Sequence, residues 1–263
     1  MVDIHHHLLW GLDDGSRNLE ESVAMARVAV ADGITHVVCT PHANSHYLYD
    51  PQEITEKIEK LQQKLNEEGI DLKLGRGCDF HLSYDNIQEI KPDPSRFSIN
   101  GLGYLLVELP DFGISHALTE TYYQLQVVGL TPILTHPERN PTLQSDKRRM
   151  VEWIRGGLLI QVTAGSVLGH MGKQAQRMAH QLLADRWVHF IATDAHNTTS
   201  RPPKMREAYE LIAERYGSDY AHALCIGNPL AVFMGKPLAS QAEPLHVYED
   251  LQEKSWWRKL FSR

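Results

Sequence analysis

Short apolar runs alternate with amphipathic stretches along most of the chain. Seven runs have the length and composition of buried strands and are bounded by turn residues. They cover residues 2–5, 35–40, 71–77, 104–108, 131–136, 158–164 and 188–194.

Helical patterns lie between these runs. Asn18 and Glu21 have the spacing of a capping box before a helix that Gly33 ends, and Asp50 starts a charged helix that Gly69 ends. The charged helix carries one apolar stripe, formed by Ile54, Ile58, Leu61 and Leu65. Further helices are predicted from Ser115 to Gly129, over residues 146–155 and around residues 173–185.

The unit of strand followed by helix repeats about seven times over roughly 200 residues, without a linker. Such alternation predicts a parallel sheet that can close into a barrel related to the eightfold α/β barrel. We favour a barrel over an open doubly wound sheet because no glycine-rich phosphate loop follows the first strand. We expect one α/β barrel over residues 1–238 and a tail over residues 239–263, polar at first and then aromatic and basic.

The composition narrows the class of protein. The 263 residues are 42% hydrophobic and 22% charged, with a net charge of −7, which excludes a disordered chain and argues against a nucleic-acid binder. No apolar run is long enough to span a bilayer, the N-terminus lacks a signal-peptide pattern, and three scattered cysteines give no disulfide framework. We therefore expect a cytoplasmic enzyme.

Histidine is the outlier. The chain holds 15 histidines, about twice the usual share. Scatter over the surface would be the ordinary explanation, and gathering at one place would indicate metal binding. The positions of the histidines decide between the two.

Almost every predicted strand ends in an imidazole or a carboxylate. The carboxyl ends of the strands of a parallel barrel meet on one face, so these side chains are expected to converge. The converging set is His5, His7, His42, Asp79, Glu108, His136, Asp194 and His196. One zinc ion takes four ligands, so this larger set of nitrogen and oxygen donors predicts two or three divalent ions bridged by a carboxylate.

Other readings apply to single residues near this set. Asp79 taken alone has the character of a helix cap. Asp13 and Asp14 follow the first strand, where a further metal ligand and a turn are equally consistent with the sequence. His6 alternates away from its two neighbours and is expected to face the barrel wall.

These motifs resemble those of the polymerase-and-histidinol-phosphatase (PHP) superfamily, with H-x-H at residues 5–7, P-H at residues 41–42 and D-x-H at residues 194–196. The chain is more similar still to one branch, the bacterial manganese-dependent tyrosine phosphatases of capsule and exopolysaccharide operons. The similar segments are DIHHHLLWGLDDGS, TPH, LVELP, THPERN, TAGS and TDAHN, spread over residues 2–235.

The resemblance implies a distorted seven-stranded β/α barrel with a three-metal site that usually holds manganese; iron, cobalt and zinc are alternatives. It assigns seven ligands by position, with Glu108 as a bridge: His5, His7, His42, Glu108, His136, Asp194 and His196. The chain departs from the family pattern at Asp79, where relatives usually carry Glu, and at His6, where they often carry a small residue. Neither departure removes a donor.

The sequence also limits the mechanism. A cysteine phosphatase needs Arg six positions after its Cys, and none of the three cysteines has one. The remaining route is attack by a metal-bound hydroxide. Arg139 is placed to bind the phosphoryl oxygens, and Arg201 is a second candidate. His42 or His196 could protonate the leaving phenolate, although phenolate leaves readily without an acid.

By resemblance, we predict a protein-tyrosine phosphatase whose substrate is the phosphorylated Tyr-rich tail of a cytoplasmic autokinase that controls polysaccharide export. The alternatives are a small-molecule phosphomonoesterase, such as a histidinol-phosphate phosphatase, and a catalytically silent metal-binding module. The chain ends in SWWRKLFSR. Packing of this end on the barrel or a partner is favoured slightly over weak contact with the inner face of an anionic membrane.

Overall fold

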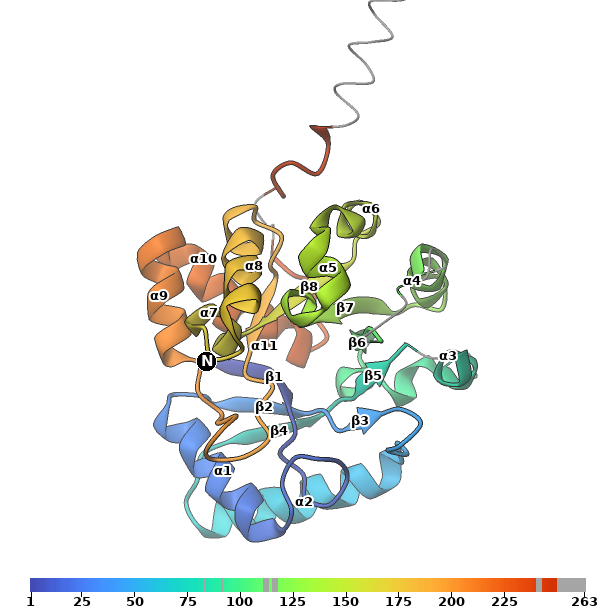
Figure 1. The fold of residues 1–263 in the computed structure, drawn as a ribbon. Helices are drawn as coiled ribbons and strands as arrows, with labels where there is room; N and C mark the ends of the chain where they lie inside the picture. Colours follow the sequence, from blue (N-terminus) through green and yellow to red (C-terminus); the bar gives the residue numbers. More distant parts are fainter. Residues whose placement is uncertain (83, 91, 111–113, 115–117, 240–242, 250–263) are drawn as a thin grey trace, which may run out of the picture.

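Parallel strands form the centre of the molecule (Figure 1). The structure is a computed structural model, and it describes residues 1–82, 84–90, 92–110, 114, 118–239 and 243–249. The strands are β1 (Val2–His6), β2 (His36–Cys39), β3 (His42–Ala43), β4 (Lys73–Arg76), β5 (Asp79–His81), β6 (Tyr104–Glu108), β7 (Thr131–Thr135), β8 (Leu159–Thr163) and β9 (Phe190–Ala192). They make one sheet of order β1-β2-β4 and another of order β3-β5-β6-β7-β8-β9. All their pairings are parallel, so the predicted α/β fold is confirmed.

The two sheets are parts of one distorted barrel. Strands β2 and β3 are separated only by residues 40–41, and β4 and β5 only by residues 77–78, so we count each pair as one strand position. The strands predicted at residues 35–40 and 71–77 contain β2 and β4, whereas β3 and β5 lie beyond the predicted ends. Strand β1 lies beside β9 through a single bridge between His6 and Ala195. Counted in this way, seven strand positions surround the centre, but no continuous ladder closes the circle between β1 and β9 among the described residues.

Helices cover the outside of the sheets (Figure 1). They are α1 (Leu19–Ala31), α2 (Pro51–Glu67), α3 (Tyr84–Ile90), α4 (Leu118–Val127), α5 (Pro141–Ser145), α6 (Val151–Arg155), α7 (Ala164–Leu168), α8 (Lys173–Ala184), α9 (Arg206–Tyr216), α10 (Ser218–His222) and α11 (Asn228–Phe233). Short helical turns are η1 (Pro94–Arg96), η2 (Ile99–Gly101), η3 (Pro137–Arg139), η4 (Lys147–Met150) and η5 (Ala223–Gly227). In the part of the chain that the structure describes, no helix is long and apolar enough to cross a membrane.

The predicted helix starts are mostly correct. The Asn18 side chain accepts the Glu21 N–H at 2.9 Å, and Asp50 caps α2 by accepting the Gln52 N–H at 2.9 Å. The capping box is only half formed, because the Glu21 carboxylate accepts from Arg17 instead of the cap residue. The single helix predicted over residues 146–155 is divided into η4 and α6. The predicted cap Ser115 lies outside the described residues.

An apolar plug fills the barrel below the strand ends. Its buried members come from five strands, η2 and α11, and they are Val2, Ile4, Val38, Ile99, Leu106, Ile133, Phe190, Ala192 and Val232. A bulge in β1 shifts the pairing register between Asp3 and His6. Because of this extra residue, Ile4 joins the plug while the next residue, His5, also points inward, where it contacts Gln161.

Part of the predicted tail packs on the barrel. The Leu245 N–H donates to the Asp185 carbonyl at 2.8 Å, and the Trp187 indole N–H donates to the Leu245 carbonyl at 2.8 Å. Val247 is buried, and the Arg155 guanidinium donates to its carbonyl. The aromatic and basic end of the tail lies outside the described residues.

Candidate metal centre

The carboxyl ends of the strands bring the eight predicted donors together. Groups of three or four lie with their ligand atoms within 4.8 Å of one another, and these groups share members. The four groups are His5, Asp79 and His136; His5, His7 and Asp194; His42, Asp79 and Glu108; and His7, Asp14, His42 and His196. Asp14, open between ligand and turn in the sequence, therefore lies with the donors.

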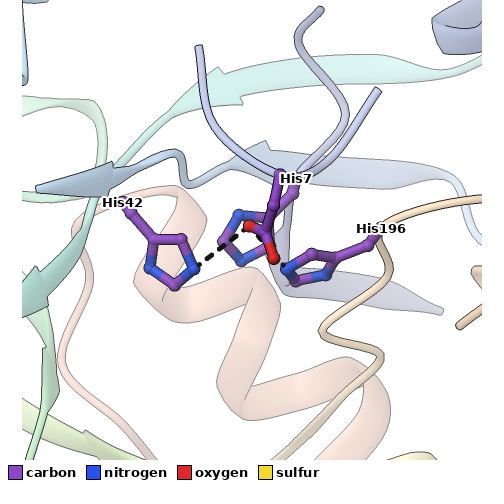
Figure 2. Close-up of side chains that lie close together, drawn as sticks. His7, His42 and His196 are labelled. Atoms are coloured by element: carbon purple, nitrogen blue, oxygen red, sulfur yellow. Dashed lines mark ion pairs between the residues drawn. The ribbon is translucent and has the colours of Figure 1, made fainter. Parts of the chain in front are cut away.

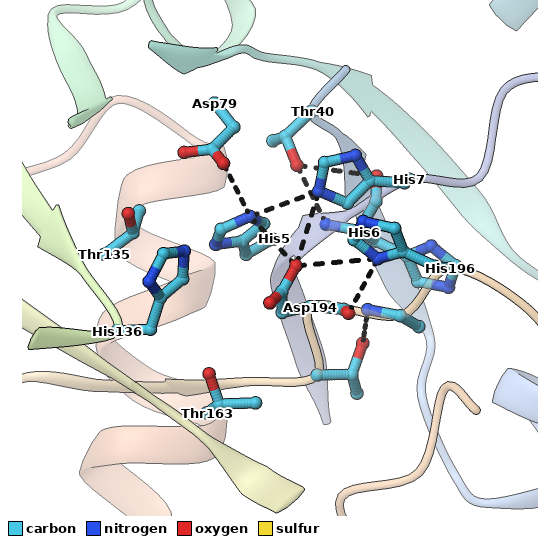
Figure 3. Close-up of polar contacts among 12 residues, drawn as sticks. His5, His6, His7, Thr40, Asp79, Thr135, His136, Thr163, Asp194 and His196 are labelled. Atoms are coloured by element: carbon cyan, nitrogen blue, oxygen red, sulfur yellow. Dashed lines mark hydrogen bonds and ion pairs between the residues drawn. The ribbon is translucent and has the colours of Figure 1, made fainter. Parts of the chain in front are cut away.

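His5 and His7 lie at the centre of the cluster (Figure 3). Each makes a hydrogen bond through Nδ1 on the side away from the cluster. His5 Nδ1 lies 3.0 Å from Gln161 Oε1, and His7 Nδ1 lies 2.7 Å from Asp13 Oδ2. In the neutral tautomer that donates from Nδ1 to these oxygens, each Nε2 presents its lone pair to the centre. The two Nε2 atoms lie 3.4 Å apart, and both lie 3.4 Å from Asp194 Oδ1.

Asp79 joins the two sides of the cluster. Its Oδ2 lies 3.4 Å from His5 Nε2 and 3.2 Å from His42 Nδ1, so the shorter side chain still reaches both imidazoles. Glu108 lies beside it, with Oε2 at 3.8 Å from His42 Nδ1 and Oε1 at 3.6 Å from His136 Nε2. The Glu108 carboxylate therefore lies between the His42 and His136 imidazoles, as expected for a bridging ligand.

Asp194 divides its two oxygens between different partners. Oδ1 faces the imidazoles of His5 and His7, whereas Oδ2 accepts from both Arg139 and Arg201. The two arginines predicted to bind phosphate therefore meet at one carboxylate of the centre. Their side chains remain 31% and 26% exposed, so both also face the solvent side of the cluster.

His42 and His196 form the third side of the cluster with His7 (Figure 2). Asp14 Oδ1 lies between them, 3.5 Å from His42 Nε2 and 3.4 Å from His196 Nε2. His196 Nδ1 lies 3.0 Å from the Asp194 carbonyl, which fixes its proton there and frees Nε2. Asp14 is the most exposed member of this group, at 53%.

The carboxylates of the centre lie so close together that they shift one another's titration. Burial and then the neighbouring carboxylates of Asp79 and Asp194 raise the pKa of Glu108 to about 9. At Asp79 burial is outweighed by His5 and His42, which hold the pKa of that carboxyl well below its usual range. Burial also lowers the pKa of His136 to about 3, so this imidazole stays neutral. A bound cation would replace the proton that Glu108 otherwise keeps.

The donor atoms fit divalent metal ions. Both Asp79 oxygens, His42 Nδ1 and His196 Nε2 are buried without a hydrogen-bond partner among the described residues. Buried polar atoms left in this way are costly unless something binds them. The mixture of imidazole and carboxylate, with no thiolate, suits manganese or iron as well as zinc.

Sequence reasoning missed two supporting residues, Gln161 and Asp13. Gln161 is the polar exception in the apolar run LLIQVTA, which was a usable signal, and Asp13 was read only as a ligand or a turn residue. Asp13 instead supports His7 and accepts the backbone N–H of His42 at 3.1 Å. His6 is fully buried, and neither of its ring nitrogens has a hydrogen-bond partner in the described part of the chain.

The cysteines take no part in the centre. Cys39, Cys78 and Cys225 are fully buried, and burial raises the pKa of each thiol. A thiol that stays protonated is a poor nucleophile. The structure therefore agrees with the exclusion of a thiolate mechanism.

The chain is similar to known proteins over most of its length. A family model described as "Capsular polysaccharide synthesis, CpsB/CapC" matches residues 1–234. The tyrosine-protein phosphatase YwqE of Bacillus subtilis is 31% identical over 225 residues, covering 85% of this chain and 88% of that protein. The tyrosine-protein phosphatase CpsB of Streptococcus pneumoniae is 28% identical over 240 residues, covering 89% and 98%.

Solved structures agree with these matches. A chain from the crystal structures of YwqE and CpsB, described as "unique metal-dependent tyrosine phosphatases", has a TM-score of 0.86 and 29% identity, covering 93% of this chain and 98% of that one. The lactonase Lmo2620 of Listeria monocytogenes has a TM-score of 0.58 at 10% identity, which indicates a shared fold alone.

Proposed function

This chain belongs to the CpsB/CapC family of capsular polysaccharide synthesis, and from that premise we propose that it is a metal-dependent protein-tyrosine phosphatase. One observation carries the proposal: overlapping groups of imidazoles and carboxylates at the strand ends, with buried oxygens and nitrogens that lack a hydrogen-bond partner in the described chain. Two arginines reach the same centre.

We assign the metal ligands as the sequence predicted them, with Asp14 added: His5, His7, Asp14, His42, Asp79, Glu108, His136, Asp194 and His196. This set would hold two or three divalent ions, and we propose manganese, because no thiolate biases the site towards zinc. Divalent ions bound there would lower the pKa of a coordinated water and neutralise phosphate oxygens.

The protein's own part in the reaction begins with fixed donors. Gln161 and Asp13 hold the Nδ1 protons of His5 and His7, so neither ring can turn its protonated nitrogen towards the centre. The apolar plug below excludes water from the floor of the site. Substrate can therefore enter only from the exposed side.

Arg139 and Arg201 bind the phosphoryl group in this proposal. Both guanidinia already converge on Asp194 Oδ2, and each has further N–H groups to donate to phosphate oxygens. Negative charge grows on those oxygens in the transition state, so the contact strengthens as the reaction proceeds. His42 and His196 share a donor group with Asp14, and we assign them to metal binding rather than to proton transfer.

We propose the phosphorylated Tyr-rich tail of a bacterial tyrosine autokinase as the physiological substrate. The test is an assay of the purified protein with Mn²⁺ on a phosphotyrosine peptide, a phosphoserine peptide and histidinol phosphate. We expect hydrolysis of the phosphotyrosine peptide, loss of activity after dialysis against a chelator, and the best recovery with Mn²⁺. Preference for histidinol phosphate, or full activity in excess chelator, would overturn the proposal.

A further inference from the structure

The mouth of the metal centre is the ring of partly exposed side chains around its buried donors. It consists of Asp14, His42, Glu108, His136, Arg139 and Arg201. Behind it, His5, His7, Asp79 and Asp194 are almost fully buried. The group that bears the phosphate must therefore extend through the mouth when the phosphate reaches these donors.

One loop at this mouth, residues 44–50 between β3 and α2, is fixed at both ends. The Asn44 side-chain carbonyl accepts the N–H groups of His46 and Tyr47 at 2.9 and 3.0 Å, and the Asn44 N–H donates to the Tyr47 carbonyl at 3.1 Å. At the other end Tyr49 is buried, and its hydroxyl donates to the Gly77 carbonyl at 3.1 Å. Such a loop holds its intervening side chains in place before substrate arrives.

Tyr47 lies against the mouth itself. Its ring is stacked on the His42 imidazole, with the ring centroids 5.9 Å apart and the planes at 17°. That separation is within the range of favourable aromatic contact. An aromatic surface therefore lies directly beside a proposed metal ligand.

Leu48 projects from the same loop into solvent. At 92% exposure it is the most exposed large apolar side chain among the described residues. Its two neighbours, Tyr47 and Tyr49, are held by the contacts above, so the chain on either side of the leucine is anchored. Leu48 thus follows directly after the residue that contacts the mouth, and an apolar side chain exposed there is suited to contact with a protein substrate.

We infer that Tyr47 and Leu48 form a substrate platform that selects phosphotyrosine in a peptide. The inference rests on the proposed phosphatase function and names the residues that would set its specificity. Tyr47 contacts the aryl ring that carries the phosphate, and Leu48 contacts an apolar side chain next to it in the substrate. A phosphoserine lacks that ring and holds its phosphate nearer the backbone, so it cannot use the Tyr47 surface while its phosphate is at the recessed centre.

The test compares Tyr47→Ala, Tyr47→Phe and Leu48→Ser on three substrates: a phosphotyrosine peptide with apolar flanking residues, the matched phosphoserine peptide and p-nitrophenyl phosphate. Tyr47→Ala is expected to lower kcat/KM for both aryl substrates about tenfold, mainly through KM, and Tyr47→Phe to restore it. Leu48→Ser is expected to raise KM for both substrates by different factors, and the factor for the phosphotyrosine peptide should be about five times the factor for p-nitrophenyl phosphate.

Matched controls separate the platform from general loss of surface contacts. Tyr123→Ala and Leu102→Ser replace residues that are 61% and 47% exposed, the first on α4 and the second directly after η2, and they should leave all three reactions unchanged. Elemental analysis checks that each variant keeps its metal. Unchanged KM in both platform variants, or equal losses on all three substrates, would overturn the inference. Failure of the wild-type protein to hydrolyse phosphotyrosine would instead overturn the proposed function.

Discussion

At the scale of single residues, Asp194 contacts two different kinds of group through its two carboxylate oxygens. One carboxylate oxygen faces the imidazoles of His5 and His7, and the other accepts from Arg139 and Arg201. The carboxylate therefore links the proposed metal ligands to the proposed phosphate-binding groups. It also means that either arginine can be removed while the other still holds Asp194.

This arrangement gives a prediction for Arg139→Ala. Loss of a guanidinium that binds the transition state more strongly than the ground state should lower kcat by roughly 10²–10³, or about 3–4 kcal/mol, with a smaller effect on KM. Metal content should stay unchanged, since Arg201 still donates to Asp194. Arg139→Lys should restore only part of kcat, because an ammonium lacks the planar fork.

The measurement is steady-state kinetics on a phosphotyrosine peptide, with elemental analysis of each variant. Arg148→Ala is the control, since that side chain is 87% exposed and lies on η4. If Arg139→Ala keeps the wild-type kcat, or loses its metal together with its activity, then Arg139 is structural and the transition-state role passes to Arg201.

At the scale of elements, the turn after β7 is the best example of a functional loop fixed by its neighbours. His136 adopts a left-handed backbone conformation at φ 33°, and η3 follows it directly. The fully buried Glu138 accepts the Thr163 N–H at 3.0 Å and so joins the turn to the end of β8. On the other side, the Asn140 amide donates to the Pro110 carbonyl at 3.2 Å.

Glu138→Ala should therefore lower the free energy of unfolding by about 1–3 kcal/mol, because the buried Thr163 N–H loses its acceptor. Glu138→Gln keeps an acceptor oxygen at that position and should lose less than half as much. Urea unfolding of the three proteins measures the difference. Equal losses in both variants would assign the effect to the charge of Glu138 rather than to its hydrogen bond.

Elements also show what the sequence could and could not predict. The strand ends were predictable because a short apolar run followed by His or Asp is a local pattern, as at residues 131–136. The bulge in β1 and the division between β2 and β3 were not, because they depend on pairing with distant strands. Gln161 was missed as a support for the same reason, because its partner His5 lies 156 residues away. Asp13 lies six residues from its partner His7, but an aspartate at that place is equally consistent with a ligand or a turn, and only the fold shows which imidazole it meets.

At the scale of the whole molecule, His189 links two strands and the last described helix. Its Nδ1 accepts the Ile160 N–H at 3.1 Å, and its carbonyl accepts from the Asn228 amide at 2.9 Å. Burial lowers the pKa of His189 to about 4, whereas the unfolded chain has the ordinary value of about 6.5. Below that value the unfolded chain binds a proton that the folded protein does not.

The free energy of unfolding should therefore fall as the pH drops from 6.5 to 4, with a contribution from His189 of about 1.4 kcal/mol per pH unit at most. His189→Asn keeps an acceptor for Ile160 but cannot take up the proton. Denaturant unfolding of both proteins across this range isolates the contribution, since the other buried histidines are common to both. Parallel curves for the two proteins would rule it out.

The seam between β1 and β9 gives the last prediction. In the described part of the chain these strands are joined at their ends by one bridge and two backbone hydrogen bonds, His7 N–H to the Ala195 carbonyl and Asp194 N–H to the His5 carbonyl, both at 2.9 Å. The Asp3 carboxylate adds a side-chain link by accepting from the Thr193 N–H and hydroxyl. The donor groups straddle this seam, because they combine His5 and His7 with Asp194 and His196. Metal bound there should hold the barrel closed where its ladder is interrupted.

At a Mn²⁺ concentration of a hundred times Kd, the free energy of unfolding should rise by about 2.7 kcal/mol, which corresponds to a rise in Tm of about 5–10 °C. Hydrogen exchange should slow more at the His7 and Asp194 amides than along the β6–β7 ladder. A chelated protein that keeps its Tm, or exchange that slows evenly over all strands, would show that the metal does not close the seam.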